Sequence, residues 1–343
     1  MTIDWGRLQP SQRMGKKVTY QEAGVDTRAA AALVNEIKAD VSRTQKQRKL
    51  HNSFGLFAAA FDLSEYQNPV IVTGCDGVGT KLELLLEHGM EAEAGKDLVA
   101  MSVNDIITTG GDPLMFLDYI GIEKLQPERI KKLISGMCDY LEDCGCILAG
   151  GETAEMPGLV PPDVVELSGF CIGAVEKEDL IQPETIQPGD VLVGYRSDGF
   201  HANGWSLCRR ILAEHGDEFS AAEIKAMLAP TRLYHDVTNG FKEGGIRAKA
   251  FAHITGGGLP ENLERLFRGM GADLTIPFWD NDPIQKLLAH SDPEDRFNAF
   301  NMGIGWVAIV DPGDAEAACG HGPGGTVLGT MRPGDGVTVT VQS

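Results

Sequence analysis

The sequence is poor in basic residues for its size. Lys and Arg number 30 against 49 Asp and Glu in 343 residues, which gives a formal net charge of −19. A surface that binds nucleic acid or an anionic membrane through charge needs an excess of Lys and Arg. The composition therefore argues against both partners. It still allows a phosphorylated small molecule, which backbone amides, a few cations or Mg²⁺ can hold locally.

Cysteine pairs and long apolar runs are also lacking. The seven cysteines are scattered, and none belongs to a Cys-x-x-Cys pair. No window reaches the apolar length of a membrane span, and the polar N-terminus lacks the continuous apolar core of a signal peptide. Scattered cysteines in apolar surroundings indicate reduced thiols. We expect a cytoplasmic protein whose residues 1–18 form a flexible lead.

Several common catalytic motifs are absent as well. The chain has no G-x-S-x-G nucleophile elbow, no H-E-x-x-H zinc motif, and no strand followed by G-x-G-x-x-G with a distant acid. What it has is GCDGVGTK (74–81), directly after an apolar run. This segment comes close to a Walker A phosphate loop, in which a lysine follows the last glycine and a hydroxyl residue comes next. Here Thr80 precedes Lys81, so the order is reversed.

The same segment carries a carboxylate, Asp76. A carboxylate among phosphate-binding amides repels the phosphates unless a divalent cation lies between them. The segment therefore favours a metal-bridged nucleotide site. The alternative is an ordinary strand and turn with glycines for tight geometry.

The length favours two domains, because one hydrophobic core seldom fills 343 residues. Prolines at 183 and 188 mark a linker, so we expect an N-terminal ATP- and metal-binding domain over 19–178 and a C-terminal domain over 187–343. Strands and helices mix in both halves without a regular βαβ order, which predicts an α+β fold.

Three carboxylates of the first half lie beside glycines or on a helix face: Asp76, Asp105 and Glu152. Magnesium prefers oxygen ligands and needs only one or two carboxylates besides substrate phosphates, so Asp76 and Asp105 would suffice. The adjacent Asn104 offers an amide oxygen for the metal or a hydrogen bond to substrate. The alternative for each carboxylate is a helix cap or a salt bridge.

Two glycine-rich loops of the second half precede predicted helices, namely 197–204 and 255–258. Unpaired N–H groups at such positions stabilise a phosphate. His201 could donate a hydrogen bond to a phosphate or exchange a proton, although a single histidine in a loop is more often only exposed. Together with the Asp-rich loops, these features favour phosphoryl transfer, in which positioning and charge neutralisation supply most of the catalysis.

Six segments closely resemble the aminoimidazole ribonucleotide synthetase family, in order and with similar gaps from about Thr19 to Gly305. They are GCDGVGTKLEL (74–84), DLVAMSVNDIITTGGDPLMFLDY (97–119), GGETAEMPG (150–158), SGFCIGAVEK (168–177), SDGFHANGWSL (197–207) and HITGGGLPENL (253–263). The resemblance implies two α+β domains and a homodimer in which the N-terminal sheets of two subunits form one barrel. It also implies the ATP-dependent cyclisation of formylglycinamidine ribonucleotide to aminoimidazole ribonucleotide, with release of ADP and phosphate, in purine biosynthesis.

The resemblance further implies roles for particular residues. Asp76 and Asp105 would hold Mg²⁺ against the triphosphate, and Glu152, in the same cleft, would be a base or a ligand of a metal-bound water. Catalytic roles fall to Glu152, Lys81 and His201. Contacts to ATP or to a phosphate fall to Gly77, Gly79, Thr80, Lys81, Asn104, Lys38, Asn203, Gly256, Gly257 and Gly258.

One segment departs from the family. Its members commonly carry a run of several glycines before the first strand, whereas Arg48–Gly55 contains one. This difference bears on how the chain closes over ATP, since other residues restrict the backbone more than glycine does. Two alternatives remain at this point: another ATP-using relative, of the thiamine-monophosphate kinase, selenophosphate synthetase or hydrogenase-maturation type, and a dimer that binds nucleotide without catalysis.

Overall fold

The computed structural model describes residues 27–51, 57–322 and 324–342. The expected lead over 1–18 lies outside the described residues, as do residues 52–55 of the segment expected to close over ATP. The first half contains α1 (Thr27–Arg43), β1 (Pro69–Gly77), α2 (Lys81–Glu87), α3 (Glu91–Ile107), β2 (Asp112–Ile122), α4 (Pro127–Asp143), β3 (Ile147–Glu155) and β4 (Val165–Glu176).

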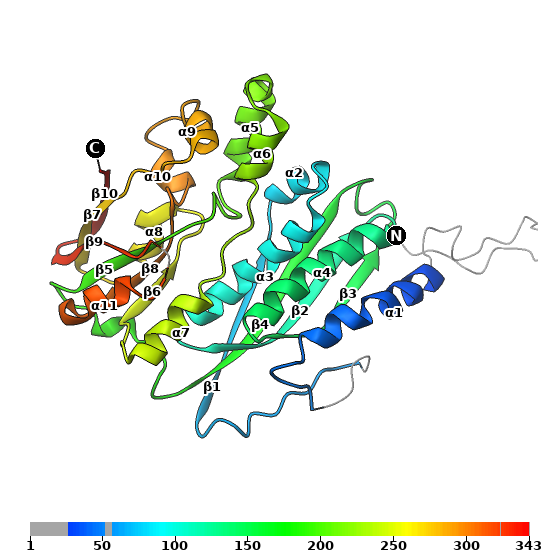
Figure 1. Ribbon diagram of the computed structural model, residues 1–343, viewed down its shortest axis with the longest axis horizontal. Helices are drawn as coiled ribbons and strands as arrows, with labels where there is room; N and C mark the ends of the chain where they lie inside the picture. Colours follow the sequence, from blue (N-terminus) through cyan, green and yellow to red (C-terminus); the bar gives the residue numbers. More distant parts are fainter. Residues whose placement is uncertain (1–26, 52–56, 323, 343) are drawn as a thin grey trace, which may run out of the picture.

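The four strands of the first half form one mixed sheet in the order β1-β4-β2-β3. β2 and β3 run parallel, while β4 is antiparallel to both β1 and β2. Helices α3 and α4 pack against each other, α3 lies on β1, β4 and β2, and α1 lies on α4 (Figure 1). No described helix covers the other face of the sheet, where Ile71 and Phe170 are exposed.

Helix α3 is buried around most of its circumference. Its apolar residues, among them Leu98 and Ile106, face the sheet. Its buried polar residues, among them Asp97 and Asn104, bond to the second half of the chain. The helix therefore lies between the two halves, which explains why a segment so apolar also carries a polar face.

The second half contains β5 (Val191–Arg196), α5 (Trp205–His215), α6 (Ala221–Met227), α7 (His235–Gly244), β6 (Ala250–His253), α8 (Gly258–Glu264), β7 (Met270–Ile276), α9 (Asp282–Leu288), α10 (Arg296–Ala299), β8 (Ile304–Val310), α11 (Ala315–Cys319), β9 (Thr326–Pro333) and β10 (Gly336–Val341). Short 3₁₀ turns lie at Pro183–Thr185, Gly216–Glu218 and Pro312–Asp314. The strands form a second mixed sheet in the order β10-β7-β9-β5-β8-β6, in which every residue of β8 is buried.

The predicted α+β class is confirmed, with one mixed sheet in each half. Two strands are longer than expected, because β1 includes the first glycines of 74–81 and β3 includes GGETAE (150–155). Pairing with β4 and β2 provides backbone partners that outweigh the weak strand propensity of glycine. All seven cysteines are free, as predicted for reduced thiols. In the described part of the chain, no helix has the length and apolarity needed to cross a membrane.

Candidate functional site

Asp76 and Asp105 come together at the sheet face that α3 covers. Asp76 lies near the end of β1, on the side of the strand that faces this helix. A Cβ built on Gly74, two residues earlier on the same side of the strand, would lie 3.7 Å from the Cβ of Asp105, so Asp105 of α3 lies next to this part of β1. Burial raises the pKa of Asp76, the Gly77 N–H opposes that shift, and the charge of Asp105 adds to it.

His253 is a residue of this site that the sequence did not single out. Its Nδ1 lies 3.0 Å from Oδ1 of Asp105, and its side chain is only 2% exposed, whereas that of Asp105 is 45% exposed. The pairing resembles the support that an outer residue gives to a metal ligand, because it fixes the orientation of the carboxylate. The only signal in the sequence is that His253 ends β6, directly before the loop 255–258.

The structure places the side chain of Asn104 differently from the expected contact with metal or substrate. Its Nδ2 donates to the carbonyl oxygen of Arg232 at 2.8 Å, and its Oδ1 accepts from the backbone N–H of Tyr234 at 3.1 Å. Asn104 is fully buried. The expected contact with metal or substrate is therefore replaced by a bridge between α3 and the second half, because the amide is already bonded to backbone.

Lys81 also differs from the expectation of a lysine beside phosphates. Its ammonium is fully buried, 2.7 Å from Oδ2 of Asp97, and donates to the carbonyl oxygen of Ala229 at 2.8 Å. Asp97 in turn accepts from the N–H and the hydroxyl of Thr231. Burial lowers the pKa of Lys81, and Asp97 opposes that shift. In this structure Lys81 joins the two halves, and its side chain has no exposed surface.

Gly77, Gly79 and Thr80 lead from β1 to the second half. Gly77 ends the strand, and Gly79 has a φ of 63°. Thr80 is the N-cap residue of α2, and its hydroxyl lies 3.2 Å from that of Ser206, at the start of α5. The segment 74–81 therefore meets the end of the loop 197–204, a contact between residues more than a hundred positions apart.

The two glycine loops of the second half adjoin each other. A Cβ on Gly256 would lie 3.5 Å from Oδ1 of Asn203. Asn262 holds the second loop in shape, since its Nδ2 donates to the carbonyl oxygens of Thr255, Gly256 and Gly258. Gly258 cannot carry a side chain, because its φ is 58° and a Cβ would lie 1.9 Å from the oxygen of Phe297.

Asn203 and His201 differ in what they offer a ligand. The Nδ2 of Asn203 is buried without a partner among the described residues, so it is a free donor beside the glycine loops. His201 is fully buried, not exposed, and the indole N–H of Trp205 donates to its carbonyl oxygen at 2.6 Å. Burial, with smaller contributions from His253 and Lys81, holds the pKa of His201 well below its ordinary value. The imidazole is therefore neutral.

Glu152 and Lys38 are not brought to this site within one chain. Glu152 is exposed on β3, and Lys38 is exposed on α1. Asp76 lies on β1, the opposite edge of the sheet. Strands lie about 4.8 Å apart, so three strand spacings separate the two edges by roughly 14 Å. The expectation of one shared cleft is therefore not met inside a single chain.

The β3 edge has a cavity of its own, of about 520 Å³, between α1 and β3. Glu152 and Asp118 line it. Burial raises the pKa of Asp118 to about 7, and the charge of Glu152 adds to the shift. This edge is a second acidic region, separate from Asp76 and Asp105.

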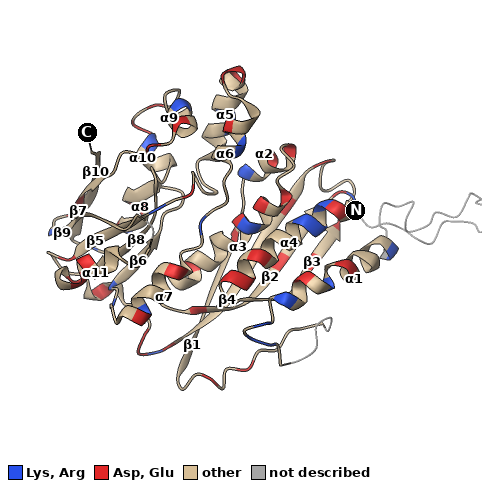
Figure 2. Cartoon of the chain, in the orientation of Figure 1, with Lys and Arg blue, Asp and Glu red and all other residues tan. Residues whose placement is uncertain are grey.

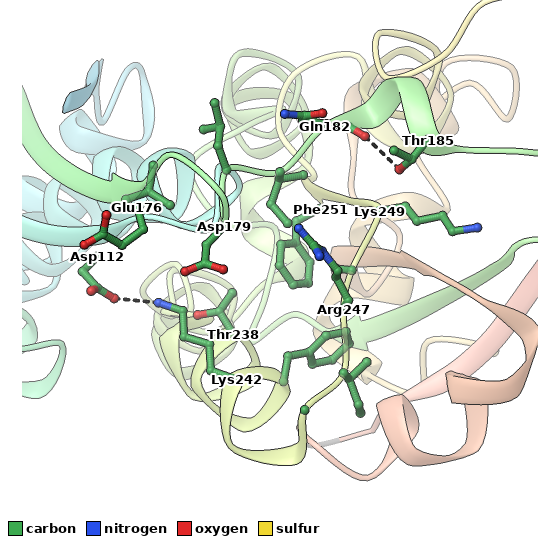
Figure 3. A pocket seen from close by; sticks show the side chains of 18 of the residues that line it. Asp112, Glu176, Asp179, Gln182, Thr185, Thr238, Lys242, Arg247, Lys249 and Phe251 are labelled. Carbon is green, nitrogen blue, oxygen red and sulfur yellow. Dashed lines mark hydrogen bonds and ion pairs between the residues drawn. The ribbon is translucent and has the colours of Figure 1, made fainter. Parts of the chain in front are cut away.

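A larger cavity, of about 890 Å³, lies elsewhere and contains none of the predicted site residues. Figure 3 shows its lining, including the ion pair between Asp112 and Lys242 at 2.7 Å, with Arg247 and Asp179 nearby. Asp112 pairs with Ala174 of β4, whereas Asp76 pairs with Gly169. Five residues of strand span roughly 17 Å, so this cavity is remote from the carboxylate pair.

The surface has mixed charge. Both basic and acidic positions occur along α1, α3 and α4 (Figure 2). At the junction of the halves, two neighbouring carboxylates, a supporting histidine and two adjoining glycine loops form one site. Oxygen ligands of this kind suit Mg²⁺.

Known proteins resemble this chain along most of its length. Residues 58–175 match the N-terminal domain of AIR synthase related proteins, and residues 187–342 match the C-terminal domain. A phosphoribosylformylglycinamidine cyclo-ligase of Geobacillus kaustophilus (strain HTA426) is 42% identical over 338 residues, covering 93% of this chain and 97% of that protein. One of Synechococcus sp. (strain CC9605) is 41% identical over 315 residues, covering 88% and 91%.

Solved structures share the fold at much lower identity. Thiamine-monophosphate kinase from Stenotrophomonas maltophilia K279a gives a TM-score of 0.66 at 19% identity, covering 90% of this chain and 95% of that chain. Hydrogenase maturation protein HypE in complex with ATP gives a TM-score of 0.67 at 16% identity, covering 93% of each. At these identities the likeness concerns the fold alone.

Proposed function

The chain belongs to the family of AIR synthase related proteins, and from this membership we infer that it is an enzyme of purine biosynthesis with phosphoribosylformylglycinamidine cyclo-ligase activity. The observation that carries the inference is about 40% identity to cyclo-ligases over nearly the whole chain. The kinase and maturation proteins share the fold at under 20% identity, so they do not favour a different substrate.

The reaction couples ATP to ring closure. The formamide oxygen of formylglycinamidine ribonucleotide attacks the γ-phosphorus of ATP, and ADP leaves. The amidine nitrogen then attacks the former formyl carbon, the bond from that carbon to the phosphorylated oxygen breaks, and phosphate leaves as the imidazole ring forms with loss of a proton. Phosphorylation thus turns a poor leaving group into a good one. Little covalent work falls to side chains, so the protein's task is to position and neutralise charge.

We propose that Asp76 and Asp105 hold Mg²⁺ for this reaction. The ion, when bound, neutralises charge on the transferred phosphoryl group. Both carboxylates face the junction, Asp105 is oriented by His253 at 3.0 Å, and its 45% exposure leaves it open to an ion from solvent.

The loops 197–204 and 255–258 are proposed to hold a phosphate of ATP or of the ribonucleotide. The buried, unpartnered Nδ2 of Asn203 is the donor that supports this assignment, beside Gly256, Gly257 and Gly258. From the first half, Thr80 contacts Ser206, two residues after the loop 197–204, and Gly77 and Gly79 lie shortly before Thr80 in the chain. In this proposal the neutral His201 shapes the loop, and Lys81 keeps the halves in register.

A homodimer is the proposed assembly. The uncovered sheet face exposes Ile71 at 50% and Phe170 at 40%, with a shallow cavity lined by Thr73, Cys75, Leu117 and Ile172. An exposed apolar face of this kind is typical of an interaction surface. Two such faces packed together would form a barrel across both subunits. We propose that Glu152 and Lys38 reach a catalytic site only across this dimer.

The deciding assay combines purified protein, formylglycinamidine ribonucleotide, ATP and Mg²⁺, and measures both ADP and the aminoimidazole product. ADP without aminoimidazole, under conditions that saturate a known cyclo-ligase, would reject the cyclase function. The dimer is tested separately by light scattering after size exclusion. Phe170→Asp is expected to give monomers, whereas Phe278→Asp, which changes a more exposed aromatic of the second half, is expected to leave the dimer intact.

A further inference from the structure

His215, Glu218 and His290 form a compact group on the second half. His215 is the last residue of α5, Glu218 ends the 3₁₀ turn Gly216–Glu218, and His290 follows α9. Nδ1 of His215 lies 3.1 Å from one carboxylate oxygen of Glu218, and Nε2 of His290 lies 3.2 Å from the other. Among the described residues, this is the one group of three such side chains whose ligand atoms all lie within 4.8 Å of one another.

The imidazole rings of the two histidines pack against each other. The rings of His215 and His290 stack with centroids 4.0 Å apart and an angle of 25° between planes. A nitrogen of each ring lies within 3.2 Å of the Glu218 carboxylate, although the two histidines are far apart in sequence. A cation placed among these atoms would replace the protons that the imidazoles share with Glu218.

The three donor groups favour one kind of metal ion over others. Two imidazole nitrogens and one carboxylate oxygen suit Zn²⁺, which takes this combination in tetrahedral sites with water as a fourth ligand. Mg²⁺ prefers oxygen ligands alone. The group is therefore chemically distinct from the carboxylate pair at Asp76 and Asp105.

The surroundings favour a cation that arrives from solvent. The side chains of His215, Glu218 and His290 are 39%, 44% and 23% exposed, so an ion can reach them. The group lies at the C-terminal end of α5, where the helix dipole favours positive charge. The nearby Lys286 is occupied, since its ammonium bonds to the backbone oxygen of Glu218 and to the carboxylate of Glu223.

We propose that His215, Glu218 and His290 form a zinc site that ties α5 to α9. Both elements support the loop 197–204: α5 begins directly after it, and Trp279, shortly before α9, packs edge-on against Phe200 of the loop at 5.5 Å. The ion would join the C-terminal end of α5 to the residues that follow α9. The inference rests on this donor set and is independent of the cyclase activity.

The test uses untagged full-length protein, stripped of metal with a chelator and titrated with Co²⁺ as a spectroscopic probe for zinc. The expected result is one equivalent of Co²⁺ with the visible bands of a four-coordinate ion, displaced by Zn²⁺ and not by excess Mg²⁺. His290→Gln and Glu218→Gln are expected to weaken binding more than about tenfold, since even loss of an outer-shell partner costs 10–100-fold. His88→Gln, a histidine outside the group, is the matched control.

Three results would overturn the proposal. The first is unchanged Co²⁺ binding in His290→Gln and Glu218→Gln. The second is a thiolate-to-cobalt charge-transfer band, which would assign the ion to a cysteine such as the exposed Cys75. The third is wild-type protein that binds no Co²⁺. Circular dichroism shows whether each variant is folded, and a Zn²⁺-dependent rise in melting temperature, seen in wild type and His88→Gln only, supports the site independently of spectroscopy.

Discussion

Two acidic regions lie on the same sheet and differ in what surrounds them. Asp76 and Asp118 both pair with Gly169 of β4, so they belong to one row across the sheet. Asp76 meets Asp105 and His253 at the junction with the second half, whereas Asp118 meets Glu152 beside α1. A carboxylate beside glycine is common to both regions. The regions differ in their neighbours: the second half of the chain contacts the first region, whereas α1 borders the second.

The largest expected effect on stability comes from removing the buried ion pair that joins the two halves. Lys81→Met leaves Asp97 buried without its cation, and removal of one partner from a buried ion pair costs about 3–5 kcal/mol. We expect the free energy of unfolding, measured by urea titration, to fall by that amount. Lys242→Met removes the exposed pair with Asp112 and should cost less than about 1 kcal/mol. Equal losses in the two variants would contradict a special role for the buried pair.

Asp76→Asn tests whether the first region binds the magnesium ion that the reaction uses. Loss of a charged magnesium ligand should lower turnover about 10²–10³-fold, comparable to the loss of one preorganised electrostatic contact. Raising the Mg²⁺ concentration should recover part of the rate, and circular dichroism should show an intact fold. The matched change on the same row, Asp118→Asn, should lower turnover less than about tenfold. Unchanged turnover of Asp76→Asn at low Mg²⁺ would remove the metal assignment.

His253→Gln tests a feature that distinguishes the first region, a histidine bonded to a carboxylate. The described residues that line the second region include no histidine. Glutamine keeps a hydrogen-bond donor but not the imidazole that orients Asp105 at 3.0 Å. Loss of an outer-shell partner typically costs 10–100-fold in metal affinity or activity. We expect the Mg²⁺ concentration that gives half-maximal rate to rise within that range. A fall in rate with no change in Mg²⁺ dependence would mean that His253 acts on substrate instead.

The last prediction concerns the stability of the second region and its dependence on pH. Burial raises the pKa of Asp118 to about 7, against about 3.9 in an unfolded chain. Between these values the folded state keeps a proton that the unfolded state has lost, so this group lowers stability as pH rises from about 4 to 7. Asp118→Asn should therefore be more stable than wild type above pH 7, by at most about 4 kcal/mol for a shift of about three pKa units.

The pH dependence provides the control for that prediction. The difference in free energy of unfolding between Asp118→Asn and wild type should vanish below about pH 4, where both states of the wild-type protein are protonated at this residue. Urea titrations at pH 4 and pH 8 measure it. A difference that does not change with pH would show that the carboxylate is not the cause.

Local pattern and resemblance predicted much of this structure. The periodicity of 97–109 and the glycine loops at 197–204 and 255–258 predicted elements that the structure contains. The burial of Lys81 and Asn104 was not predictable locally, because their partners at Ala229 and Arg232 lie 148 and 128 residues away. The same holds for His253, which is 148 residues from Asp105.

The order of the strands explains why Asp76 and Glu152 do not share one cleft within a single chain. Asp76 and Glu152 are both carboxylates beside glycines, and the sequence contains no direct record of which strands form the sheet edges. The order β1-β4-β2-β3 puts them at opposite edges, since β4 inserts between β1 and β2. The last strand of the first half, β4, thus helps to decide how far apart two earlier residues lie.

The bonds of Lys81 and Asn104 across the junction limit how this protein can exchange parts with its relatives. Side chains of the first half bond to backbone oxygens at Ala229 and Arg232 and to the amide of Tyr234. A chimera that joined this first half to a foreign second half would need the segment 229–234 in the same path. The two halves are therefore not interchangeable modules, and a substitution on one side of the junction is tolerated only with a suitable backbone on the other.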